Sequence, residues 1–185
     1  MNSAQILVLV LVVLALIAVV AIAFAFRKRR SQQLRERFGP EYDRVVSREG
    51  EVRKGEQVLE FRQKHREKFK VRPLSANDRA SYMQRWQQVQ ARFVDDPQGA
   101  VTVADSLVTE VMQARGYPIT DFEQRAADLS VDHPVVVENY RAAHDIALRH
   151  SRGQASTEDL PKALVHYRSL FEALSGENEL RRKEA

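Results

Sequence analysis

The 185-residue chain contains no cysteine, only seven glycines and six prolines, and no run in which apolar and polar residues alternate between turns. The absence of cysteine excludes disulfide bonds and thiolate metal sites. Glycine-rich phosphate loops and the G-x-S-x-G motif of serine hydrolases are also absent from the sequence. Apolar residues instead recur with a helical period along most of the chain. The sequence therefore predicts an all-α protein.

One long apolar run, residues 6–26, contains no charged or polar side chain. At about 1.5 Å per helical residue it spans about 31 Å, which matches the hydrocarbon core of a bilayer. A secretory signal would begin with basic residues and have a shorter apolar stretch. The alanines at 21, 23 and 25 resemble a cleavage pattern, but the basic block that follows would hinder export. We therefore expect a retained transmembrane helix.

Basic residues flank only the C-terminal end of this run. Residues 1–5 carry no basic side chain, whereas six basic residues follow the run: Arg27, Lys28, Arg29, Arg30, Arg35 and Arg37. Because basic flanks stay on the cytoplasmic side, we expect residues 1–5 to lie outside and residues 27–185 in the cytoplasm. The six basic side chains are expected to contact anionic lipid headgroups at the membrane surface.

Charge changes sign along the cytoplasmic part. The net charge is +4 over residues 27–30, +3 over 31–70, +3 over 71–94 and −6 over 95–150, and the remaining residues balance. The part near the membrane is therefore basic and the distal part acidic. Beyond Arg30 the chain has as many acidic as basic side chains, and no nucleic-acid-binding motif accompanies them, so we expect no nucleic-acid partner.

The cytoplasmic part divides into a basic helical stem (residues 27–72), a compact helical domain (73–175) and a flexible tail (176–185). In the stem, four apolar residues recur at intervals of seven: Phe38, Val45, Val52 and Leu59. Polar residues occupy the complementary heptad positions, and Gly50 and Gly55 weaken a continuous helix. We therefore expect one or two stem helices that pack on the domain rather than a self-standing coiled coil.

Capping signals divide the domain into helices. Ser75 is the predicted N-cap of a helix with an aromatic stripe at Tyr82, Trp86 and Phe93, which we interpret as core rather than as a ligand groove. The next helix begins at the Asp95–Asp96–Pro97 turn, where the acids are expected to cap the helix rather than to catalyse a reaction. Thr120 is predicted to cap a short helix ending near residue 129, and Ser130 or Asp132 a longer one starting near residue 134. The last helix covers residues 157–175.

The most polar segment of the domain lies between residues 121 and 144. Its candidate partner-binding residues are Asp121, Glu123, Asp128, Asp132 and His133. His133 and His144 can share one helical face, but three turns separate them and spacing alone places no third ligand. We therefore predict neither a metal nor another cofactor. Catalytic residues are likewise not assigned, and an enzymatic activity stays open.

Several sequence strings are similar to a family of bacterial proteins that have an N-terminal membrane segment and no assigned activity. The strings are RFGPEYDR (37–44), RFVDDPQGAV (92–101), RGYP (115–118) and DFEQRAADLSVDHP (121–134). The resemblance covers residues 37–144. It implies a single-pass protein of a bacterial inner or plasma membrane, and it brings no catalytic residues.

These observations favour a membrane-anchored cytoplasmic interaction or scaffold module that binds a protein partner. One alternative is a metal-dependent enzyme or sensor around Asp132 and His133. Another is a sensor of anionic lipid surfaces that acts through residues 27–70. Three alanines on one face of the membrane helix, at 18, 21 and 25, also allow a homodimer.

Overall fold

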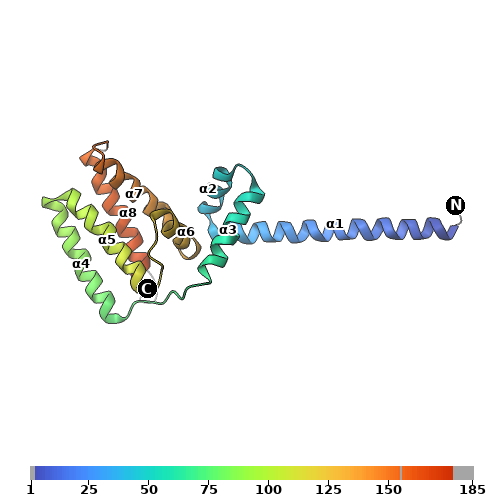
Figure 1. The fold of residues 1–185 in the computed structure, drawn as a ribbon, viewed down its shortest axis with the longest axis horizontal. Coiled ribbons are helices and arrows are strands. Elements are labelled where there is room, and N and C mark those ends of the chain that lie inside the picture. Colours follow the sequence, from blue (N-terminus) through green and yellow to red (C-terminus); the bar gives the residue numbers. More distant parts are fainter. Residues whose placement is uncertain (1–2, 155, 177–185) are drawn as a thin grey trace, which may run out of the picture. The chain divides into compact units, whose positions relative to one another are not determined.

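In a computed structural model of the protein, residues 3–154 and 156–176 are described, and every regular element in these ranges is a helix (Figure 1). The predicted all-α fold is confirmed. The chain forms two compact units, Met1–Arg37 and Phe38–Ala185. Residues 1–2 and the predicted tail beyond Gly176 lie outside the described residues.

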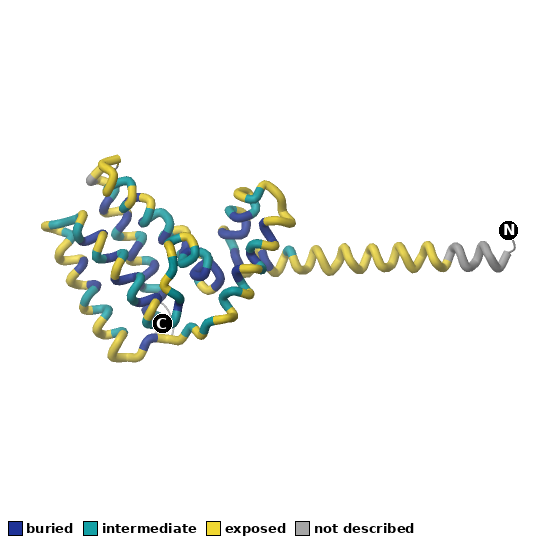
Figure 2. The backbone as a smooth tube through the Cα atoms, in the orientation of Figure 1, coloured by how far each residue is buried: buried dark blue, intermediate teal, exposed yellow. Residues whose placement is uncertain are grey.

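Helix α1 (Ser3–Phe38) contains the predicted membrane segment. Its part from Leu11 onward is long and apolar enough to cross a membrane, with a mean hydropathy of 2.4 in its most apolar window. No residue of that window is buried in the protein, and Figure 2 shows the described part of the apolar segment as exposed. Its large side chains, such as Val20 and Phe24, are 68% and 71% exposed. A continuous exposed apolar surface of this kind is typical of a segment that contacts a membrane or another protein.

The second unit begins with a helical hairpin, α2 (Pro40–Glu49) and α3 (Val52–Arg66). The stem sequence thus contributes two short helices after α1, and they belong to the same compact unit as the following helices. Gly55 explains how α2 and α3 pack closely, because a Cβ atom at this position would lie 2.8 Å from the Cα atom of Val46. Glycine therefore weakens α3 locally but allows the two backbones to approach each other.

Helices α4 (Ala76–Asp95) and α5 (Pro97–Arg115) form an antiparallel hairpin (Figure 1). The Ser75 hydroxyl accepts a hydrogen bond from the Asp78 amide (3.1 Å), and Asp96 Oδ1 accepts one from the Gly99 amide (2.8 Å). Both predicted caps are confirmed. The Trp86 ring stacks on the Phe171 ring with 4.9 Å between centroids, so the aromatic stripe contributes to the core.

Two predicted caps are wrong in the next segment. Asp121, not Thr120, caps α6, because its carboxylate accepts a hydrogen bond from the Gln124 amide (3.0 Å). Neither Ser130 nor Asp132 caps a new helix, because α6 continues through both, and the Ser130 hydroxyl donates to the Ala127 carbonyl (2.6 Å) within it. The next helix starts at residue 137 rather than near 134, without a side-chain cap. The remaining helices are α6 (Phe122–Asp132), α7 (Val137–Ser151), η1 (Thr157–Asp159) and α8 (Leu160–Ser175).

The main apolar core is formed by α4, α5, α6, α7 and α8. Helix α8 packs against both α5 and α7, and its inward residues are fully buried. The buried apolar residues of the α2–α3 hairpin lie outside this core: Tyr42, Val45 and Leu59. The buried apolar residues of the hairpin are thus not part of the main core.

Candidate functional site

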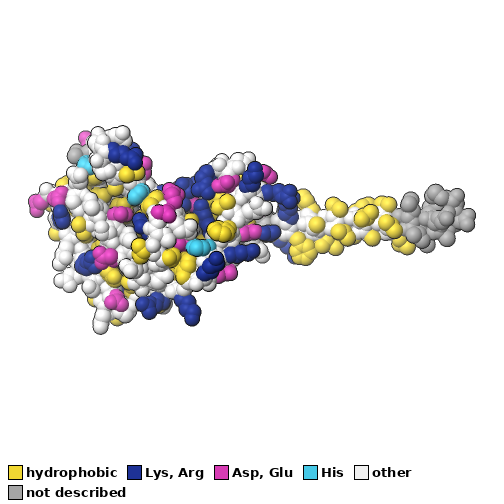
Figure 3. Space-filling view, viewed as in Figure 1, with side chains coloured by type: hydrophobic (Ala, Val, Ile, Leu, Met, Phe, Trp, Pro, Cys, Tyr) yellow, Lys and Arg dark blue, Asp and Glu magenta, His cyan; other side chains and the backbone are white. Residues whose placement is uncertain are grey.

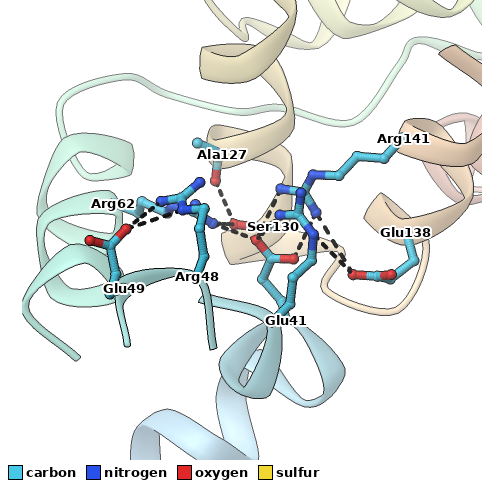
Figure 4. A network of polar contacts seen from close by, with 9 residues as sticks. Glu41, Arg48, Glu49, Arg62, Ala127, Ser130, Glu138 and Arg141 are labelled. Carbon is cyan, nitrogen blue, oxygen red and sulfur yellow. Dashed lines mark hydrogen bonds and ion pairs between the residues drawn. The ribbon is translucent and has the colours of Figure 1, made fainter. Parts of the chain in front are cut away.

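Charged side chains connect the α2–α3 hairpin to helices α6 and α7 (Figure 4). At the centre is Glu41 in the first turn of α2, whose side chain is completely buried. The Arg62 Nη1 atom of α3 donates to Glu41 Oε1 at 2.6 Å. From α7, Arg141 donates to both carboxylate oxygens, at 2.7 and 2.9 Å. One carboxylate thus binds guanidinium groups from two different helices.

The surroundings of this carboxylate are predominantly basic. Arg62 is only 7% exposed and also donates to the Ser130 hydroxyl of α6 (3.1 Å). Arg44 approaches the same carboxylate from the next turn of α2, at 3.6 Å. Burial lowers the pKa of Arg62 from its ordinary value, and the ion pair with Glu41 opposes this shift. Buried charges are tolerated only when they are paired and hydrogen-bonded, so Glu41 is required to keep these arginines in place.

Asp128, on the α6 face toward α3, is the second polar contact. It is 1% exposed, and its Oδ1 atom accepts a hydrogen bond from the Gln124 side chain at 2.8 Å. The His65 Nε2 atom of α3 lies 3.8 Å from the same oxygen, whereas Oδ2 is buried without a hydrogen-bond partner. Burial raises the pKa of Asp128, against the opposing effects of Gln124, His65 and the nearby arginines. This carboxylate is inside the protein and is not accessible to a partner.

The third contact is made by Asp132 at the end of α6. Its carboxylate accepts hydrogen bonds from Arg66 of α3 and from the Tyr117 hydroxyl, the latter at 2.6 Å. His133 is the C-cap residue of α6, and its Nε2 atom lies 3.5 Å from Arg115 Nη1. Within the described part of the chain, no three His, Asp or Glu side chains converge in a way that would hold a metal ion. The contacts of Asp132 with Arg66 and Tyr117 therefore indicate a structural role, and they give no support to an enzyme or sensor site around Asp132 and His133.

The exposed members of the predicted partner surface lie at the other end of α6. Asp121, the N-cap, and Glu123, in the first turn, are both exposed, and they follow Ile119, which is 53% exposed. An eleven-residue helix is about 16 Å long, so this end is well separated from Asp132 and His133. The structure therefore separates the five predicted residues into two exposed acids, a buried acid, a paired acid and a histidine at the C-cap of α6.

The predicted membrane-surface residues lie on the C-terminal part of α1. All six are exposed, and the helix continues without a break through Arg27 and Arg37 to Phe38. Elsewhere, a shallow groove of about 170 Å³ lies between α4 and α5. None of the predicted site residues lines this groove. Its lining consists of apolar, polar and basic side chains: Arg85, Gln88, Val89, Arg92, Val103 and Leu107.

Sequence reasoning missed the residues at the centre of the charged network. Glu41 and Arg141 are 100 positions apart, and each resembles an ordinary surface residue of an amphipathic helix. The signal that did exist was the location of Glu41 inside the RFGPEYDR string. Comparisons with protein-family models, with curated proteins and with solved structures find no match.

Proposed function

We propose that this protein is a membrane-anchored helical module that binds a protein partner at the membrane surface. The observation that carries the proposal is the continuity of α1, which runs as one helix from the apolar segment to Phe38. Phe38 is the first residue of the folded unit and lies twelve residues after Phe26. At helical rise this tether is about 18 Å long, so a partner at the same membrane is held at a high effective concentration.

The direction of insertion follows from the basic flank of the helix. Arg27, Lys28, Arg29 and Arg30 come directly after the apolar segment, and residues 1–5 contain no basic side chain. This asymmetry supports a single-pass topology with the folded unit in the cytoplasm. The inner or plasma membrane location is part of this proposal; the resemblance of the sequence strings implies it, and no comparison with known proteins supports it.

The partner-binding region is assigned to the exposed start of α6. Asp121 and Glu123 provide two exposed carboxylates, and Ile119 provides an exposed apolar side chain beside them. Acidic and basic side chains are otherwise mixed over the visible face of the folded unit in Figure 3, and many acids are paired with arginines. A basic, partly apolar surface on the partner would complement this end of α6.

The test is proximity labelling in the native host, with a labelling enzyme fused to the C-terminus of the full-length protein. The variant combines Asp121→Asn, which retains the helix cap, with Glu123→Lys. The control is Asp145→Lys, an equally accessible change on α7, where the native side chain is 65% exposed. We expect a small reproducible set of labelled proteins that the control retains and the variant loses. An unchanged set in the variant, or diffuse labelling of abundant membrane proteins, would refute the proposal.

A further inference from the structure

We infer that the outward face of α3 is a docking surface for anionic lipid headgroups. This inference rests on the membrane anchoring in the proposed function but does not depend on a protein partner. The face consists of residues spaced three or four apart on α3 and its C-terminal turn: Lys54, Gln57, Phe61, Lys64 and Lys68. All five are exposed, and Phe61 is 64% exposed.

Helical geometry makes this face the opposite of the buried one. At 100° per residue, the five positions fall within a stripe about 80° wide. The buried positions of α3, among them Gly55, Leu59 and Arg62, lie on the other side of the helix. The contacts with α2 and α6 therefore use one side of α3 and leave the lysine face uncovered within the described structure.

Acidic residues of α3 do not lie within this stripe. Glu56 is buried and accepts a hydrogen bond from the Tyr42 hydroxyl at 2.9 Å. Glu60 and Glu67 fall about 70° or more from the centre of the lysine face by helical spacing. Glu51, at the N-cap, forms an ion pair with Lys54 at 3.3 Å. The centre of the face thus combines lysines with one aromatic ring.

The exposed ring is the feature that distinguishes this face from an ordinary solvated one. Phe61 contacts His65 by stacking, with 6.1 Å between ring centroids, but two thirds of its surface stays exposed. Helices that lie in the membrane interface place basic side chains among the headgroups and let an aromatic ring enter the boundary of the acyl chains. Lysine stems extend along such a surface and place their ammonium groups among the headgroups.

We assign the membrane as the ligand of this face because the same chain contains the proposed membrane anchor. Val52, the first residue of α3, follows Phe26, the last residue of the apolar segment, by twenty-six positions. Cations near an anionic leaflet gain free energy, and this gain falls off within a Debye length. A covalently tethered hairpin pays little further entropy to reach that surface.

The absence of native cysteine makes a direct test possible. A single cysteine at Phe61→Cys carries an environment-sensitive fluorophore on the full-length protein, which is reconstituted into vesicles of phosphatidylglycerol and phosphatidylcholine. Val165→Cys on α8 is the matched control, because its native side chain is 65% exposed. We expect the label at position 61 to shift to shorter wavelength and to be quenched by nitroxide-labelled lipids, whereas the label at 165 stays aqueous.

Charge and lipid dependence complete the test. The wavelength shift should disappear in pure phosphatidylcholine and at high salt. A single lysine-to-glutamine substitution should lower the ratio of docked to undocked protein by about fivefold, whether it is made at Lys54, Lys64 or Lys68. A label at 61 that stays as aqueous as the label at 165 in anionic vesicles would overturn the inference and leave the partner proposal untouched. Protein that does not float with the vesicles would overturn the anchoring and both proposals together.

Discussion

Arg141 of α7 donates two hydrogen bonds to Glu41 of α2, at 2.7 and 2.9 Å, across 100 positions of the sequence. Because Glu41 follows Phe38 by three residues, this contact begins almost where the folded unit begins. It connects the α2–α3 hairpin with α7, a helix of the main core. Buried charges thus contribute to the attachment of the hairpin to α6 and α7, which makes it sensitive to single substitutions.

The first prediction concerns the loss of the Glu41 charge. Glu41→Gln keeps the size of the side chain but leaves Arg62 and Arg141 buried beside a neutral group. Removal of one partner from a buried ion pair costs about 3–5 kcal/mol, and we expect a loss of this order in the free energy of unfolding. Chemical denaturation of the full-length protein in detergent, followed by circular dichroism, measures it.

Glu49→Gln is the control for this experiment. Its partner Arg48 is on the surface, with 47% of the side chain exposed, and the two groups interact at 2.9 Å. An exposed pair of this kind contributes less than about 1 kcal/mol. Equal effects of Glu41→Gln and Glu49→Gln would show that the buried network does not stabilise the fold.

How far the sequence predicts this protein depends on the distance over which each interaction acts. The caps at Ser75 and Asp96 involve residues three positions apart, so local spacing was sufficient to predict them. The pair of Glu41 and Arg141 is determined by tertiary packing, and no local pattern identifies it. The burial of Asp128 could not be predicted for the same reason. Its carboxylate lies in a polar segment and resembled a surface acid, but the packing of α3 on α6 buries it.

The second prediction compares two acids of α6. Burial raises the pKa of Asp128 above its value in the unfolded chain, so the folded state binds this proton more tightly. Lower pH therefore stabilises the protein through this group, and at pH 7 the buried charge is unfavourable. Asp128→Asn should be at least as stable as the native protein at neutral pH, and its advantage should shrink as the pH falls through the raised pKa.

Asp132→Asn should behave in the opposite way. Its carboxylate accepts hydrogen bonds from Arg66 and the Tyr117 hydroxyl, and an amide cannot replace the charge that faces Arg66. We expect this variant to be less stable at neutral pH. Denaturation curves from pH 7 into the acidic range measure the free energy of unfolding of both variants. The prediction for Asp128 is wrong if Asp128→Asn destabilises the protein at pH 7 as much as Asp132→Asn does.

The third prediction concerns alkaline pH. Burial and the hydrogen bond to Asp132 raise the pKa of Tyr117, and burial beside Asp105 raises the pKa of Tyr167. Above about pH 10 the unfolded chain loses these protons and the folded protein retains them, so the free energy of unfolding should fall as the pH rises. Phenolate absorbance should show that Tyr117 and Tyr167 ionise only on unfolding. Tyr117→Phe should reduce the steepness of this pH dependence.

The fourth prediction tests the close packing of the hairpin. Gly55→Ala would raise helix propensity by about 1 kcal/mol if α3 were isolated. In the folded protein, however, the added Cβ atom would lie 2.8 Å from the backbone of Val46, so α2 and α3 must separate. We expect a net loss of stability and faster hydrogen exchange in both helices. A stabilised variant would show that the hairpin accommodates the methyl group without separating.

The last prediction concerns the membrane segment. Leu16 lies at the centre of the apolar run, and its side chain is 61% exposed, so a charge placed there has no protein partner in the described structure. An arginine at the centre of a membrane helix costs about 3 kcal/mol on insertion, and Leu16→Arg combined with Val20→Arg doubles this cost. We expect the double variant to be released by alkaline carbonate, whereas the native protein stays in the membrane fraction. The control Leu16→Phe keeps the segment apolar and should be retained. Release of the native protein by carbonate would contradict the anchor, because an exposed apolar helix that does not cross the bilayer would have to be covered by another protein instead.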